Sequence, residues 1–164
     1  MSVLVAAGRG TVRDAKALVA AARAWAAAQG GEVQLLDAGV VVGPDHLLVA
    51  AERAARALAE GRGSSKELPA ETILYTSGER QIATAIRKMG VREGDSGVAV
   101  IAWGCDPDAL LASLNLTRDD ALLAATAEKL RRFGITDAEL ATVPEGRQAD
   151  LVLERVALVE VLKG

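Results

Sequence analysis

Aromatic side chains are scarce in this sequence. Its 164 residues include one Phe, one Tyr and two Trp, so only 2% of the chain is aromatic. Aromatic rings are the usual platforms on which nucleic acid bases stack. Any binding of nucleic acid must therefore depend mainly on charge and on backbone groups.

Cysteine and histidine are almost absent. Cys105 and His46 are the single residues of their types, which excludes an intramolecular disulfide and a zinc site built from Cys and His ligands. We therefore expect a reducing, cytoplasmic setting, no metal and no cofactor.

No long hydrophobic run free of charge is present. The longest apolar stretch, residues 12–29, is interrupted by Arg13, Lys16 and Arg23, so we expect neither a signal peptide nor a membrane span. The 19 basic and 22 acidic side chains give a net charge of -3, which provides no general attraction to polyanions, and no DNA partner is expected.

Short apolar runs alternate with amphipathic stretches along the chain. Strands are predicted for residues 2–6, 33–37, 72–76 and 97–103, and the last run is apolar enough to be a central strand buried on both faces. Helices are predicted after Gly10, after Pro44, before Gly90 and over residues 150–163. With 51% hydrophobic residues, we expect one α/β domain over residues 1–164, a layered structure with a mixed β-sheet and helices packed on its faces.

Capping residues mark several helix starts. A side-chain oxygen at the N-cap accepts a hydrogen bond from a backbone N–H of the first turn. The same role accounts for the acidic pairs Asp106 with Asp108 and Asp119 with Asp120, so no catalytic residue is predicted. The predicted capping pairs are Thr76 with Glu79, Thr117 with Asp120, Thr136 with Glu139, and Asp106 followed by Pro107.

A glycine-containing turn offers an alternative. Gly8, Arg9 and Gly10 follow the first predicted strand, where glycines let a phosphate approach the amides of the next helix. The third glycine of a dinucleotide fingerprint is replaced by Arg13, and no Walker lysine is present. A small nucleotide-binding enzyme that uses this turn, with Cys105 at the end of the central strand, stays open as an alternative.

Residues 75–82 are more informative. Here a predicted strand turns into a helix with Gly78 at the bend, and the helix amides, Ser77, Arg80 and Gln81 together could hold a phosphate or a terminal ribose. The residues alone favour the alternative, an ordinary capped helix that has a solvated basic face.

The order of several short motifs is distinctive. They are QLLDA at 34–38, VVV at 40–42, HLLVAA at 46–51, ETIL at 71–74, the pairs Ser77 with Gly78 and Gln81 with Ile82, and LERVALVE at 153–160. In this order they resemble the small accessory subunit of the KEOPS complex, the family of PRPK-binding proteins. The segment 105–148 carries no motif of that family, and Tyr75 and Thr76 stand where a basic residue is expected.

The resemblance implies a non-catalytic subunit of the machinery that makes threonylcarbamoyladenosine in tRNA. Such a subunit binds the small atypical kinase/ATPase of the complex and recruits tRNA through its 3′ CCA end. An adaptor that binds the kinase without RNA stays open as a further alternative. Leu158 and Leu162 are the expected kinase contacts. The expected RNA contacts are Lys66, Arg80 and Arg87 for charge, Ser77 and Gln81 for hydrogen bonds, Gly78 for close backbone approach, and Ile82 or His46 for a terminal base.

Overall fold

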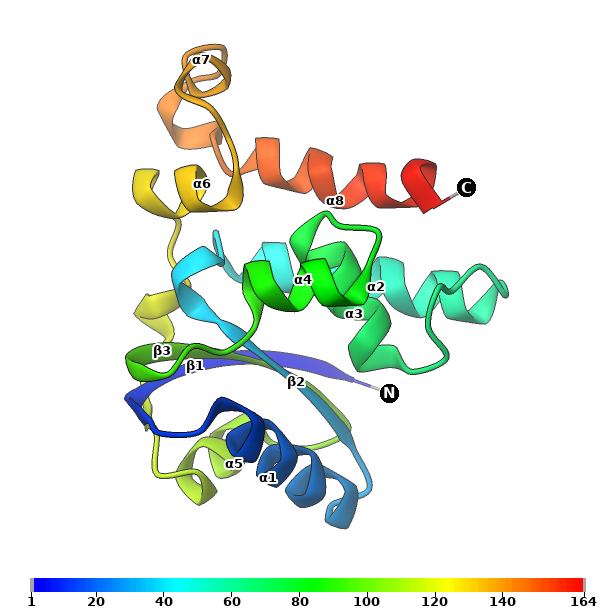
Figure 1. Ribbon diagram of the computed structural model, residues 1–164, viewed down its shortest axis with the longest axis vertical. Coiled ribbons are helices and arrows are strands. Elements are labelled where there is room, and N and C mark those ends of the chain that lie inside the picture. The colour runs from blue at the N-terminus through cyan, green and yellow to red at the C-terminus, as the bar shows by residue number, and fades with distance from the viewer. Residues whose placement is uncertain (1, 164) are drawn as a thin grey trace. The chain divides into compact units, whose positions relative to one another are not determined.

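The computed structural model describes residues 2–163 and shows a four-stranded sheet and eight α-helices within them (Figure 1). Its contacts divide the chain into two compact units. The sheet unit comprises the described residues up to Gly39 together with Gly90–Leu123, and the helical unit comprises Val40–Met89 and the described residues from Ala124 onward. The α/β class is confirmed, whereas a single domain over residues 1–164 stays a prediction.

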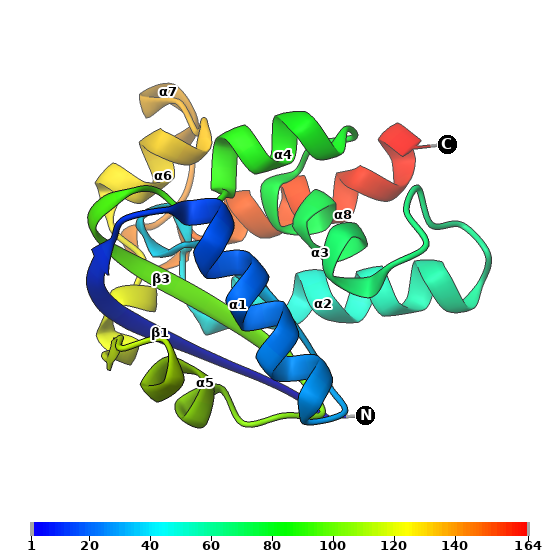
Figure 2. The same cartoon turned by 60° about the horizontal axis from the view of Figure 1, so that its bottom comes forward.

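The sheet unit is built on strands in the order β2-β3-β1-β4. All three pairings are antiparallel, so the sheet is not mixed as predicted. Helices α1 and α5 pack side by side against one face of it (Figure 2). The elements are β1 (Val3–Val12), α1 (Ala15–Ala28), β2 (Glu32–Asp37), β3 (Gly94–Trp103), α5 (Pro107–Ser113) and β4 (Thr117–Arg118).

Strand β3 is the central strand that the sequence predicts. It pairs with β2 on one side and β1 on the other, and every residue from Val98 to Trp103 is buried. Alternate residues of its pleat join β1, β2, α1 and α5 in one apolar cluster, which forms the core of this unit.

The predicted turn at Gly8, Arg9 and Gly10 is wrong, because these residues continue β1 through to Val12. A Cβ on Gly8 would lie 2.7 Å from Leu111 Cδ2, and one on Gly10 would lie 2.8 Å from Leu116 Cδ2. The two glycines therefore let α5 and the segment after it approach the strand closely. They do not form a phosphate-binding turn.

The helical unit has six α-helices among its described residues. Helices α2, α3 and α8 share an apolar core that includes Ala54, Tyr75 and Val156. No helix within residues 2–163 is long and apolar enough to cross a membrane. The helices are α2 (Pro44–Ala59), α3 (Leu68–Ser77), α4 (Ile82–Met89), α6 (Ala127–Phe133), α7 (Asp137–Leu140) and α8 (Asp150–Lys163). The 3-10 helices among the described residues of both units are Ala38–Val40, Asp120–Leu123 and Glu145–Arg147.

Helix α3 replaces the strand predicted for residues 72–76. Thr76 lies inside this helix, where its hydroxyl donates to the Thr72 carbonyl at 2.7 Å, so the predicted cap of Thr76 with Glu79 is wrong. Thr117 lies in β4, and its predicted pairing with Asp120 is wrong as well.

Two predicted helix starts are confirmed. Asp106 caps α5 ahead of Pro107. Thr136 and Glu139 form a reciprocal capping box at α7.

Candidate functional site

The junction between α3 and α4 lies at the centre of the predicted RNA site. Gly78 ends α3 with a left-handed backbone, φ 73°, and its N–H donates to the Tyr75 carbonyl at 3.2 Å. The N–H of Glu79 reaches the Leu74 carbonyl at 3.2 Å. This pair of bonds is the Schellman motif, which needs a left-handed residue and so favours glycine. Gly78 therefore marks the end of a helix, not a bend from strand to helix as predicted.

Ser77 is buried, and its groups hold the junction together. Its hydroxyl donates to the Leu74 carbonyl at 3.1 Å and accepts from the Glu79 N–H at 3.2 Å. Its own carbonyl accepts from Lys88 Nζ at 2.7 Å. Because it is fully buried, Ser77 cannot provide the surface hydrogen bond predicted for it. Its contacts instead fix the shape of the neighbouring loop.

Lys88 of α4 lies at the same junction, although no role was predicted for it from the sequence. Besides Ser77, its ammonium lies 3.6 Å from a Glu79 carboxylate oxygen and 3.7 Å from the centre of the Phe133 ring. Partial burial lowers the pKa of Lys88, and Glu79 opposes that shift. A cation here also suits the carbonyl end of α3, where the helix dipole is negative.

His46 is buried beside the same junction. Its Nε2–H donates to the Thr76 carbonyl at 2.7 Å, and its Nδ1 accepts from the Val42 N–H at 3.1 Å. The Phe133 ring packs against it in a T-shaped arrangement at a centroid distance of 5.6 Å. Burial lowers the pKa of His46 from 6.5 to about 4, so the imidazole is neutral at pH 7. With 1% of its surface exposed, His46 cannot form the surface for a terminal base that was predicted.

The other predicted RNA contacts lie on the outside of the helical unit. Arg80 and Gln81 are exposed immediately before α4, Arg87 is exposed on α4, and Ile82 is half-buried at its first position. Arg87 donates to the Thr84 hydroxyl at 3.2 Å, whereas Arg80 forms no ion pair with any residue in the described chain. An unpaired guanidinium is available to an anion without breaking an existing contact.

Lys66 lies in the loop between α2 and α3, which Glu71 holds in place. Glu71 is fully buried, and its Oε1 accepts from the N–H groups of Ser64 at 2.9 Å and Ser65 at 3.0 Å. Two consecutive amides that share one carboxylate oxygen fix the path of the backbone. The next residue, Lys66, is exposed, and we see no ion pair to it from residues 2–163.

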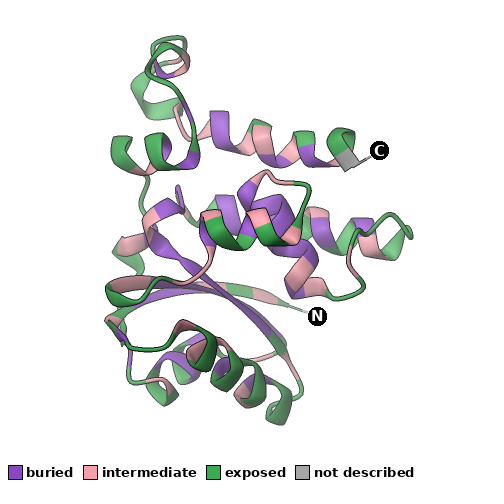
Figure 3. Ribbon diagram, in the orientation of Figure 1, coloured by how far each residue is buried: buried purple, intermediate pink, exposed green. Residues whose placement is uncertain are grey.

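Helix α8 has a buried side and an exposed apolar side. Val152, Val156 and Val159 are buried, and their spacing of four and three residues places them on one side of the helix. Leu158 and Leu162 are 47% and 48% exposed, and Val161 is 72% exposed. The exposed positions are visible toward the C-terminal end of α8 (Figure 3). We call Leu158, Val161 and Leu162 the α8 stripe.

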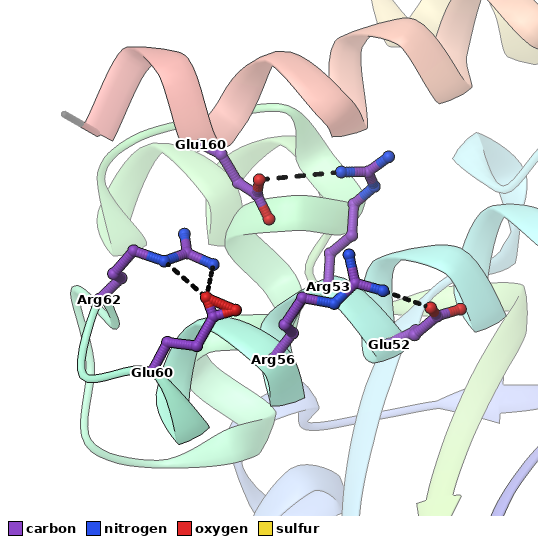
Figure 4. A network of polar contacts seen from close by, with 6 residues as sticks. All are labelled: Glu52, Arg53, Arg56, Glu60, Arg62 and Glu160. Carbon is purple, nitrogen blue, oxygen red and sulfur yellow. Dashed lines mark hydrogen bonds and ion pairs between the residues drawn. The ribbon is translucent and has the colours of Figure 1, made fainter.

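An ion pair joins α8 to α2. Glu160 Oε2 lies 3.9 Å from Arg53 of α2, close to two further ion pairs, Glu52 with Arg56 and Glu60 with Arg62 (Figure 4). All three pairs are at least partly exposed, so each adds little stability. Of these, only the pair of Arg53 with Glu160 joins α8 to α2, and it marks a side of α8 that does not carry the α8 stripe.

Cys105, which belongs to the enzyme alternative, lies in surroundings that disfavour its thiolate. Burial raises the pKa of the Cys105 thiol, and Asp106 adds to that shift, whereas a nucleophilic cysteine needs a lowered pKa. Its thiol points to the Glu32 carbonyl at 3.7 Å. Within residues 2–163 no group of three or more His, Cys, Asp or Glu side chains could hold a metal ion.

Most of the chain matches a known family. Residues 11–122 match the family model described as "Kinase binding protein CGI-121". The match spans the sheet unit from the end of β1 and the helical unit from α2 to α4. Comparison with curated proteins gives no match.

Proposed function

The chain belongs to the CGI-121 family of kinase binding proteins, and from this we propose that it is the accessory subunit of a KEOPS complex. In that role it does no covalent chemistry. It binds the atypical kinase/ATPase subunit through the α8 stripe and recruits tRNA for threonylcarbamoyladenosine formation through its 3′ CCA end. A cytoplasmic location belongs to the same proposal.

The α8 stripe supports the kinase-binding part. Three exposed apolar side chains within five residues form a surface whose burial by a partner would be favourable, by about 1.5 to 3 kcal/mol for a leucine that becomes fully covered. The opposite side of α8 is already packed, and about half of the surface of Leu158 and of Leu162 is left for a partner to cover. This is the observation on which the choice of kinase surface depends.

A charge in the α8 stripe tests that choice. We expect Leu158→Asp to weaken binding of the kinase subunit by at least about tenfold, measured by calorimetry, while circular dichroism and the melting temperature stay close to wild type. Ile86→Asp is the matched control, because Ile86 is a similarly exposed apolar residue, 53%, on α4. Equal affinity of wild type and Leu158→Asp, or a larger loss with Ile86→Asp, would place the kinase surface elsewhere.

The unpaired cations support the tRNA part. Arg80 next to the first amides of α4 provides the donors that a phosphate or a ribose needs, and Ile82 provides an apolar contact for a base. Lys66 and Arg87 add charge. A 3′ CCA tail is single-stranded, so its phosphates, hydroxyls and base faces are all accessible to such a site.

Arg80→Glu is the matching test for tRNA. We expect the variant to bind tRNA about tenfold more weakly and to show a salt dependence reduced by about one counterion. Arg23→Glu, which changes an exposed arginine of α1, should retain wild-type binding. Each protein is measured with intact tRNA and with tRNA lacking CCA, at two salt concentrations. Binding that does not depend on CCA or on Arg80 would contradict the proposed RNA site, and absence of tRNA binding would favour an adaptor that contacts only the kinase.

A further inference from the structure

One edge of the sheet has backbone groups without a partner. Strand β1 lies at the margin of the sheet next to β3 (Figure 2), and β4 covers its outer edge only at Gly8 and Arg9. At Ala7 the same edge is closed by other means, because its N–H donates to Asp120 Oδ1 and its carbonyl accepts from the Asp119 N–H. Between the start of β1 and Ala7, no segment of the described chain is hydrogen-bonded to this edge.

The direction of each backbone group follows from the alternation along a strand. The Ala7 groups point outward, whereas the Ser2 carbonyl points inward and accepts from the Gly104 N–H at 3.2 Å. Groups of residues two apart point the same way, so the N–H and C=O groups of Val3 and Val5 point outward. Neither residue has a hydrogen-bond partner on that side within the described chain.

The side chains of this segment have the character of an interface. Leu4 is 49% exposed, and residues 2–7 contain no charge and no proline. Edge strands that must stay unpaired usually carry lysine, proline or a bulge to prevent association. The short sequence Val-Leu-Val has none of these features.

We propose that this edge pairs with the same edge of a second copy of the chain, in an antiparallel arrangement with its two-fold axis at Leu4. In this register Val3 of one copy lies opposite Val5 of the other, and the outward groups of both residues form four hydrogen bonds between the copies. The two Leu4 side chains face each other as a non-hydrogen-bonded pair, whose Cα atoms lie about 4.5 Å apart. The segment is uncharged, so the pairing brings no like charges together. The closed edge at Ala7 limits the contact to this short segment, so the dimer is weak and depends on concentration.

Cysteine cross-linking tests the register. In a Cys105→Ser background, Leu4→Cys is expected to form a disulfide-linked dimer under mild oxidation, because its Cα separation across the axis fits a disulfide. Val3→Cys is the control, since the same register separates the two Val3 Cα atoms by about 8 Å, which is too far for a disulfide. Equal cross-linking of the two variants would overturn the proposal.

Sedimentation tests the association without cysteine. Wild type should show reversible dimerisation as its concentration rises, and Val5→Pro should abolish it. Proline removes only an outward N–H, which leaves the ladder to β3 intact. Identical sedimentation of wild type and Val5→Pro would refute the dimer. Hydrogen exchange in which the amides of Val3 and Val5 are protected only on addition of the kinase subunit would also refute it, because the edge would then bind that partner.

Discussion

The buried imidazole of His46 makes the stability of the protein depend on pH in a specific way. The unfolded chain takes up a proton on His46 near pH 6.5, whereas the native imidazole does so only at about pH 4. Between these values the unfolded state binds more protons, so the free energy of unfolding falls as the pH is lowered. The loss is about 2 kcal/mol between pH 7.5 and pH 5, and about 3 kcal/mol once pH 4 is passed, below which it does not grow.

The structure gives the reason for the low pKa. The Val42 N–H donates to Nδ1 at 3.1 Å, and a protonated Nδ1 would carry a hydrogen that points at this donor. Burial removes the water that would otherwise stabilise the imidazolium. The Thr76 carbonyl accepts from Nε2 and raises the pKa, but this effect is smaller than that of burial.

Urea unfolding at pH 7.5 and pH 5 measures the effect. His46 is the single histidine, so the difference between wild type and His46→Gln isolates its contribution from that of the carboxylates. We expect wild type to lose about 2 kcal/mol more than the variant between these pH values. The same imidazole gives one unambiguous set of NMR resonances. A titration midpoint near 6.5, or equal pH dependence of the two proteins, would refute the reasoning.

Two further substitutions test the fold around the candidate site and the sheet. Gly8→Ala places a Cβ 2.7 Å from Leu111 and should lower the free energy of unfolding by about 1 to 3 kcal/mol in urea titrations, whereas Gly146→Ala, which meets no atom within 4 Å, should leave it unchanged. Glu71→Ala removes the acceptor of two loop amides and should speed their hydrogen exchange and lower stability by about 2 kcal/mol. Exposed Glu67→Ala should do neither, and unchanged loop exchange in Glu71→Ala would show that the carboxylate does not hold the loop.

The elements with one apolar side could be predicted from the sequence. Helices α1 and α2 show spaced apolar positions, and Pro44 at the start of α2 fixes its first turn. Strand β3 is recognisable because it is apolar throughout and rich in valine. In these segments the conformation that the residues favour locally is also the one in which their apolar side chains are buried. The sequence pattern therefore predicts the structure correctly.

Helix α3 could not be predicted in this way, because it is buried on every side. Each residue from Glu71 to Ser77 is buried, which removes the amphipathic pattern that identifies a helix. Its threonines, isoleucine and tyrosine favour strands locally. The structure overrides that preference, and the threonine hydroxyls are satisfied by carbonyls one turn earlier, as with Thr72 and Leu68 at 2.7 Å. Pro69 near its start and Gly78 at its end were the remaining signals of a helix.

The change from strand to helix also moves the proposed anion site. If Gly78 were a bend into a helix start, the amides around Ser77 would attract a phosphate. Because Gly78 instead ends α3, the groups nearest to it are carbonyls at the negative end of a helix dipole, which repel anions. Lys88 neutralises that end and is held there by Glu79 and Ser77, so it is not free for RNA. The donors available to a phosphate therefore begin at Arg80 and Gln81, where α4 starts, and the buried Ser77 and His46 contribute by holding α3 in the position from which that loop leaves.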